Sequence, residues 1–191
     1  MINKVEQLIY KPNSNPFHIP ISTWTQLWWK WLHSAPRHMN PATDKTGLFW
    51  NSSQLNPNVW FLAGTLGGSA IRRCSMSDAR AILFPIITSA FSYAVDPQLK
   101  TEKELAKAAK EDIDRVVKLG LILNGTAVEN LERFRIRTKP FRDVINGIPT
   151  IAVSDGYWIF LKPLKVKKFK IYFVGQNVDF FNEVTYYLSI Y

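Results

Sequence analysis

The stretch TIAVSDGYWIFL, residues 150–161, places Asp155-Gly156 between two apolar runs. β-Branched and aromatic residues are typical of strands, and Asp-Gly between such runs is a strong signal for a tight turn. The stretch therefore predicts two strands joined by a turn. The Asp155 carboxylate would bond to the backbone of that turn, or serve as a catalytic group on it.

Similar short runs recur from residue 58 onward and predict about seven to nine strands. Asn124-Gly125 is the strongest hairpin signal among them. The glycines of GTLGG, residues 64–68, favour a second hairpin, because they lack the spacing of a nucleotide-binding loop. Pro85 cannot donate to a ladder, which places its run near a sheet edge. The other runs are NVWFLAG (58–64), SAIRRCSM (69–76), RFRIR (133–137), KFKIYFVG (168–175) and EVTYYLSIY (183–191).

The tryptophan-rich segment TWTQLWWKWLH predicts a helix over about 23–33, with Thr23 and Gln26 as a capping box. At 100° per residue one apolar arc collects Trp24, Leu27, Trp28, Trp31 and Leu32. That arc is interpreted as the packing face of the helix. Trp29 and His33 fall on the polar flank, and they are the part of this segment expected to contact a ligand.

A second helix is predicted over about 101–118, in TEKELAKAAKEDIDRVVKLG. Thr101 and Glu104 have the spacing of a capping box, and Gly120 is expected to end the helix. Two helices among many short strands favour a mainly β fold with added helices, an antiparallel β-sandwich or jelly-roll-like body. We expect residues 1–20 to form an extended N-terminal arm and residues 21–191 a single β-rich domain.

Composition limits the class of protein. The 191 residues are 47 % hydrophobic and 20 % charged, which is typical of a globular chain. A single cysteine, Cys74, excludes an internal disulfide, and no segment has the length of a secretory leader or a membrane span. We therefore expect a cytoplasmic protein, or one exported by a route without a leader. The net charge of +9 favours an acidic partner without choosing its kind.

No enzyme signature stands out. His18, His33 and His38 lack the spacing of a metal site, and no G-x-S-x-G element marks a nucleophile, so we expect no metal and no cofactor. Asp44, Asp155 and His33 are weak catalytic candidates, to which Arg72 or Arg73 could add positive charge. The two aspartates have an equally good structural role in their turns.

Basic residues alternate with apolar ones in RFRIR, which would put Arg133, Arg135 and Arg137 on one face of a strand. If the lysine-rich segment 162–170 lay beside it, Lys167 and Lys168 would extend a basic face able to hold anionic groups. The alternative is a solvated outer face whose positive charge prevents edge pairing. Sequence-specific recognition of nucleic acid is not expected, because no matching motif accompanies the charge.

Several motifs together resemble a family of small, mostly exported bacterial and archaeal proteins of unassigned function. They are W-x-x-x-WW-x-W from residue 24, VWFLAGT from 59, SDGYW from 154 and VTYYLSI from 184. The resemblance implies that residues 24–191 form one unit, and it implies no activity. The chain departs from the family in lacking a leader and cysteines near Trp50, Phe91 and Ala108, which suits a reducing compartment.

These observations leave two main functions open, and whether the protein is an enzyme stays uncertain. The first is a non-enzymatic binding module that recognises an anionic ligand, a polysaccharide or an acidic protein. Its contacts would come from a basic face or from aromatic-lined loops. The second is a hydrolase-type enzyme whose aspartate and histidine residues come together from loops. A third possibility, a secreted effector that binds a host protein, predicts only an exposed apolar patch.

Overall fold

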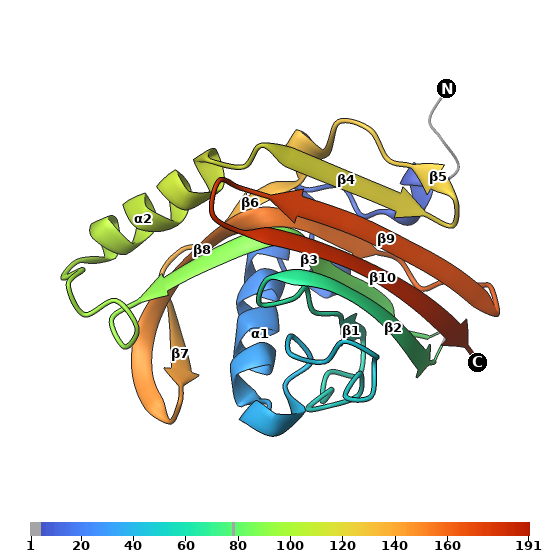
Figure 1. Cartoon of the computed structure of the whole chain (residues 1–191), viewed down its shortest axis with the longest axis horizontal. Helices are drawn as coiled ribbons and strands as arrows, with labels where there is room; N and C mark the ends of the chain where they lie inside the picture. Colours follow the sequence, from blue (N-terminus) through green and yellow to red (C-terminus); the bar gives the residue numbers. More distant parts are fainter. Residues whose placement is uncertain (1–4, 78) are drawn as a thin grey trace.

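A computed structural model describes residues 5–77 and 79–191 and shows two mixed β-sheets with two α-helices (Figure 1). Sheet A has the strand order β1-β3-β8-β6, with β7 also paired to β8. Its strands are β1 (Val59–Phe61), β3 (Ala81–Ser92), β6 (Arg135–Arg137), β7 (Phe141–Ile145) and β8 (Ile148–Leu161). All pairs are antiparallel except β1 with β3.

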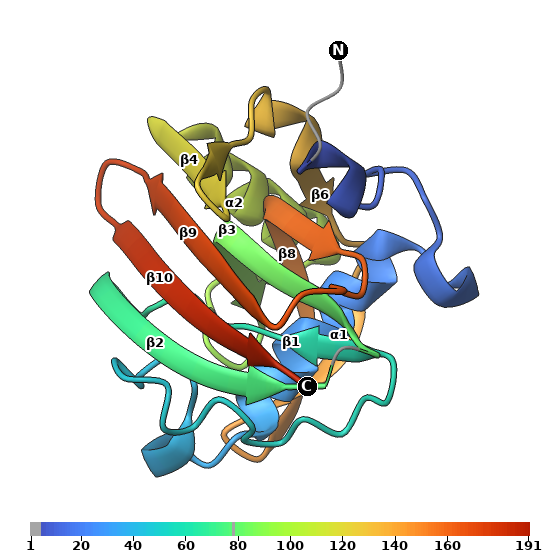
Figure 2. The same ribbon diagram turned by 90° about the vertical axis from the view of Figure 1, so that its right-hand side faces the viewer.

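Sheet B has the order β2-β10-β9-β4-β5, and its strands lie side by side in Figure 2. They are β2 (Gly68–Met76), β4 (Lys118–Leu123), β5 (Thr126–Ala127), β9 (Lys168–Gln176) and β10 (Phe181–Ile190). Here β2 and β10 are parallel and the other pairs antiparallel. The predicted mainly β, sandwich-like body with two helices is confirmed, with one parallel pair in each sheet.

The main core fills the space between the sheets. Alternate residues of β2, β9 and β10 point inward, so that Phe173 and Tyr186 are buried against Phe84 of β3. The sheets approach closely where Gly175 faces Ile87, since a Cβ on Gly175 would lie 2.6 Å from the Ile87 Cβ. The core is therefore closed by tight sheet-to-sheet contact.

The opposite face of sheet A is covered by α1 (Ile21–Ser34). Trp24, Trp28 and Trp31 are between 1 % and 5 % exposed, and they pack on Phe61, Trp158 and Phe160. Each of the three indole N–H groups donates to a backbone carbonyl, so burial leaves none of them unpaired. The predicted tryptophan packing face is confirmed. The predicted Thr23 cap is wrong, because the helix begins at Ile21, after Pro20.

The second helix, α2 (Glu102–Asp114), packs through Leu105 and Ala109 on Val153, where β3 and β8 extend beyond sheet B. The capping box of Thr101 and Glu104 is present as predicted. Gly120 does not end this helix, because the chain has already entered β4. Four short 3₁₀ turns complete the fold: Glu6–Leu8, Pro16–His18, Arg37–Met39 and Leu131–Phe134.

Sheet A has an edge at β1, and side chains occupy the outward backbone groups of that strand. The Gln54 amide donates to the Phe61 carbonyl at 2.6 Å and accepts from the Phe61 N–H at 3.1 Å. Asn56 accepts from the Val59 N–H at 2.9 Å. Two loop side chains thus take the place of a neighbouring strand.

Two turn predictions are wrong. Asp155-Gly156 lies inside the continuous strand β8, and Gly156 is needed because a Cβ there would lie 2.6 Å from Thr88. The segment 64–68 crosses from sheet A to sheet B, although Gly67 and Gly68 do adopt positive φ. Strand β1 pairs only with residues 81–83 of β3, so Pro85 lies past the end of that pairing. On the other side of β3, Pro85 lies at a β-bulge in the pairing with β8. The Asn124-Gly125 hairpin is present, joining β4 to β5.

The N-terminal segment lies along sheet A. Ile9 forms an isolated bridge with Leu161, and Tyr10 packs edge-on against Phe160. Residues 1–4 of the predicted arm lie outside the described residues. In the described part of the chain, no helix has the length and apolar character needed to cross a membrane.

Candidate functional site

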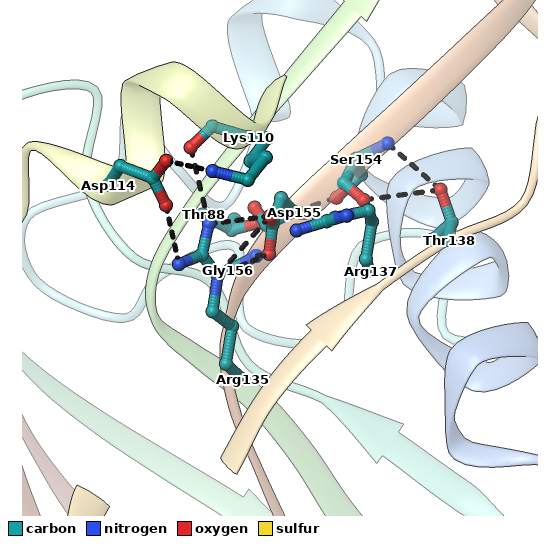
Figure 3. A network of polar contacts seen from close by, with 9 residues as sticks. All are labelled: Thr88, Lys110, Asp114, Arg135, Arg137, Thr138, Ser154, Asp155 and Gly156. Atoms are coloured by element: carbon teal, nitrogen blue, oxygen red, sulfur yellow. Dashed lines mark hydrogen bonds and ion pairs between the residues drawn. The ribbon is translucent and has the colours of Figure 1, made fainter. Parts of the chain in front are cut away.

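Asp155 is fully buried at the junction of β8, β6 and α2 (Figure 3). Its carboxylate accepts hydrogen bonds from Arg135 at 2.8 Å and Arg137 at 3.1 Å, and from the Gly156 N–H at 2.8 Å. Arg135 also donates to Asp114 of α2 at 2.8 Å, and these two carboxylates raise its pKa. The hydrogen-bonding capacity of the Asp155 carboxylate is therefore filled by structural partners. Asp155 does not line the cavity beside His33, described below.

Asp44 is also a structural carboxylate. It accepts hydrogen bonds from the backbone N–H groups of Thr46, Gly47 and Phe49, between 2.8 and 3.0 Å. Burial raises the pKa of Asp44, but these hydrogen bonds outweigh that effect and leave it below its usual value. The residue shapes the loop that runs beside β2, where the Ile71 N–H donates to the Lys45 carbonyl.

Arg72 and Arg73 point to opposite faces of β2. Arg72 is 2 % exposed and donates to the carbonyls of Ala63 and Gly64, as well as to the hydroxyl of Tyr186. Burial raises the pKa of Tyr186 to about 12, so its hydroxyl stays protonated beside the guanidinium. Arg72 thus connects loop and sheet in the interior, whereas Arg73 is exposed on the outer face of sheet B.

The predicted basic face divides between the two sheets. Arg135 and Arg137 share a face of β6, in sheet A, and are engaged by Asp155. Arg133 precedes the strand, in a 3₁₀ turn, and pairs with Glu6 at 3.2 Å. Lys167 and Lys168 are exposed at the start of β9, in sheet B. Lys167 and Lys168 therefore do not extend a face with Arg135 and Arg137. At the other end of the lysine-rich segment, Lys162 lines a second cavity together with Arg133.

His33 lies at the wall of a cavity and, unlike Arg133 at the second cavity, it is paired with a buried carboxylate. The His33 Nδ1 is 2.8 Å from Oδ2 of Asp143 in β7, whose side chain is 2 % exposed. The other Asp143 oxygen accepts from the Val144 N–H at 2.8 Å. The His33 ring lies against the Trp29 ring, with centroids 5.4 Å apart. A buried carboxylate and an aromatic ring thus fix the orientation of the imidazole.

Trp29 contacts His33 and is itself held in place by β8. Its indole N–H donates to the Ser154 hydroxyl at 2.8 Å, and its ring packs edge-on against Trp28. Ser154 is fully buried in β8 and its backbone is paired with Thr138. Trp29 is only partly buried. The predicted pair of Trp29 and His33 is therefore one unit, held against sheet A at the end of α1.

The cavity beside His33 has a volume of about 1090 Å³. One wall is the last turn of α1, with Lys30, His33 and Ser34, and the other is the β7–β8 hairpin. The hairpin and the end of β3 supply a largely apolar lining: Tyr93, Ala94, Val144, Ile148, Pro149 and Ile151. The polar residues of the hairpin that line the cavity are Arg142, Asp143, Asn146 and Thr150. A few polar groups on an apolar wall are typical of small-ligand sites.

Asp143 is the residue that the sequence interpretation missed. Asn146-Gly147 is a hairpin signal like Asn124-Gly125, and both of its residues adopt positive φ. Read as a hairpin, FRDVINGIPT places Phe141 and Asp143 on one face of a strand. Its pairing with His33 of α1 depends on the tertiary fold.

Among the described residues, no three histidine, cysteine, aspartate or glutamate side chains lie together in a way that could hold a metal ion. Burial raises the pKa of the Cys74 thiol to about 12, so this side chain is not a thiolate ligand or nucleophile at neutral pH. The groups that line the cavity include an imidazole, a carboxylate, hydroxyl groups and flanking cations. Comparison with models of known families, with curated proteins and with solved structures finds no match.

Proposed function

We propose that the protein is a binding module that takes up a small ligand with an anionic group in the His33 cavity. The observation that carries this proposal is the pairing of His33 with buried Asp143 at the cavity wall. With Nδ1 directed at Asp143, Nε2 is left to meet a ligand, because it makes no hydrogen bond to a described residue.

Charge supports an anionic ligand group. Lys30 and Arg142 line the cavity, and the carboxylate of Asp143 is already engaged by His33. The cavity wall therefore carries two positive charges and one carboxylate, a balance that favours an anionic ligand. The apolar hairpin wall would bury the remainder of the ligand, which favours a molecule with one anionic end and an apolar body.

A screen of small carboxylates and phosphate esters by thermal shift, followed by calorimetry, tests this proposal. We expect His33→Gln to weaken binding of the best compound by about tenfold or more, because it removes a hydrogen bond to a charged group. The matched control is His38→Gln, since His38 is exposed and outside the cavity lining. Equal affinity of the two variants would disprove the proposal.

A hydrolase-type enzyme is the second candidate, favoured by the same pair of side chains. A histidine oriented by a buried carboxylate is a common general base. The Ser34 hydroxyl donates to the Trp31 carbonyl, so the attacking group would be a water molecule at Nε2 that transfers its proton to His33.

Product analysis separates the two functions. A ligand recovered unchanged after long incubation supports binding alone, whereas hydrolysis lost in His33→Gln and kept in His38→Gln supports the enzyme. For the enzyme we expect Asp143→Asn to lower kcat more than it changes KM, because Asp143 would orient the base without touching substrate.

A further inference from the structure

The outer face of sheet B is open. No described helix lies over it in Figures 1 and 2. Ile71 of β2 is 56 % exposed, Tyr187 of β10 is 41 % exposed and Ile122 of β4 is 38 % exposed. We call this surface the sheet B face; its other exposed or partly exposed residues include Ser69, Arg73, Ser75, Lys118, Lys168, Lys170, Tyr172, Glu183, Thr185 and Ser189. It differs from the outer face of sheet A, which α1 covers.

Three of these residues form a row across neighbouring strands. Tyr187 is paired in register with Arg73 on one side and with Lys170 on the other. The Arg73 guanidinium and the Lys170 ammonium each lie 5.4 Å from the centroid of the Tyr187 ring. Two cations therefore lie against a tyrosine ring that is itself exposed to solvent.

A third cation extends this row. Lys168 lies two residues before Lys170 on the same face of β9, in register with Ser189. The one carboxylate among the described residues of this face, Glu183, lies four residues before Tyr187 on β10, away from Lys168. Its Oε1 accepts from the Tyr172 hydroxyl at 2.7 Å, which raises the pKa of Tyr172. The half of the face around Tyr187 is therefore positively charged.

We propose that the sheet B face docks on an anionic lipid surface. Arg73, Lys168 and Lys170 would contact headgroup phosphates and carboxylates, with an electrostatic attraction that increases with the number of cations near the surface. Tyr187 has the apolar ring and polar tip that suit the interface between headgroups and acyl chains. Ile71 and Ile122, in the next row, would add apolar contact there.

Other polyanions fit this face less well. Single-stranded nucleic acid is usually held by stacking of bases on free aromatic faces, and Arg73 and Lys170 already occupy the faces of Tyr187. A single small anion would meet an open sheet and stay largely in water. A lipid surface instead presents many anionic groups to all three cations at once.

Co-sedimentation with vesicles tests the docking. One set is phosphatidylcholine alone, and the other contains phosphatidylserine at about one lipid in three. We expect binding to the second set only, decreasing steeply between about 0.05 and 0.5 M salt. The triple variant Arg73→Gln/Lys168→Gln/Lys170→Gln should bind about 100-fold more weakly, since each cation contributes roughly a factor of five.

The control variant Lys103→Gln/Lys107→Gln/Lys139→Gln removes three exposed charges elsewhere and should bind like the wild type. Circular dichroism and thermal melting of both variants establish that they fold. Equal loss in the control would show a general charge effect and overturn the docking surface. A single-stranded oligonucleotide that binds this face while the vesicles do not would also overturn it. Because neither outcome involves the His33 cavity, the ligand proposal is tested separately.

Discussion

Asp155 and Asp143 are both buried aspartates on paired strands of sheet A, yet their surroundings differ. Asp155 is fully enclosed and bound by two arginines and a backbone N–H. Asp143 also accepts from a backbone N–H, but the side chain paired with it is a histidine that lies at a cavity wall. Burial of a carboxylate is thus common to both regions, and the kind of partner distinguishes them.

The difference has a chemical meaning. Arginine stays protonated over the whole accessible pH range, so its pairing with Asp155 is a fixed connection between β6, β8 and α2. Histidine can accept or donate a proton at Nε2 while Nδ1 stays bonded to a carboxylate. The first arrangement serves the fold, and the second leaves one atom available to a ligand.

Asp155→Ala tests the structural side of this comparison and should have the largest effect. Removal of the carboxylate leaves Arg135 and Arg137 without their shared partner, and we expect the free energy of unfolding to decrease by about 3 kcal/mol. Urea denaturation measures it. Asp179→Ala is the control, because Asp179 pairs with Arg115 at the surface. Equal losses in the two variants would contradict a special role for Asp155.

Asp143→Ala should have a smaller effect on stability and a specific effect on His33. We expect the free energy of unfolding to decrease by about 1–2 kcal/mol, because the hydrogen bonds from the partly exposed His33 and from the Val144 N–H are lost. In ¹⁵N NMR spectra of the imidazoles, the wild type should show the proton of neutral His33 on Nδ1, and the variant should shift it toward Nε2. An unchanged tautomer in the variant would contradict the proposed orientation.

Asp44→Asn should have the smallest effect, and one that depends on pH. The folded protein holds the pKa of Asp44 below its ordinary value of 3.8, so the ionised group stabilises the fold above that value. We expect the variant to be about 1 kcal/mol less stable at pH 7, and the difference to shrink as the pH falls below 4. Thermal melting across this range measures it; a difference independent of pH would contradict the assignment.

Local patterns predicted the parts of the fold that depend on local physics. The arc of Trp24, Trp28 and Trp31 follows from helical periodicity, and the cap of Thr101 and Glu104 from backbone hydrogen bonding within one turn. Trp29, placed on the polar flank, is partly buried and packs on the same cluster, so its contact with a ligand stays a prediction. The arc and the cap are each decided by residues close together in the sequence.

Features that depend on distant contacts were misread. Gly156 follows an aspartate, as in a hairpin, but it is glycine because Thr88 of β3 approaches it closely. The alternation in RFRIR is that of one strand, yet Phe134 lies in the core between the sheets and Ile136 packs beneath α1. No local pattern shows that Asp155 lies opposite these arginines, so their pairing became visible only in the assembled sheet.

The edge of β1 shows how the chain protects a vulnerable strand. Val59–Phe61 is an apolar strand at the border of sheet A, and unpaired backbone groups on such a strand can recruit a strand of another molecule. The side chains of Gln54 and Asn56 make the hydrogen bonds that a neighbouring strand would make to β1. Unlike a strand, they present no second row of backbone groups on their outer side. These side-chain amides therefore oppose pairing of β1 with a strand of a second molecule.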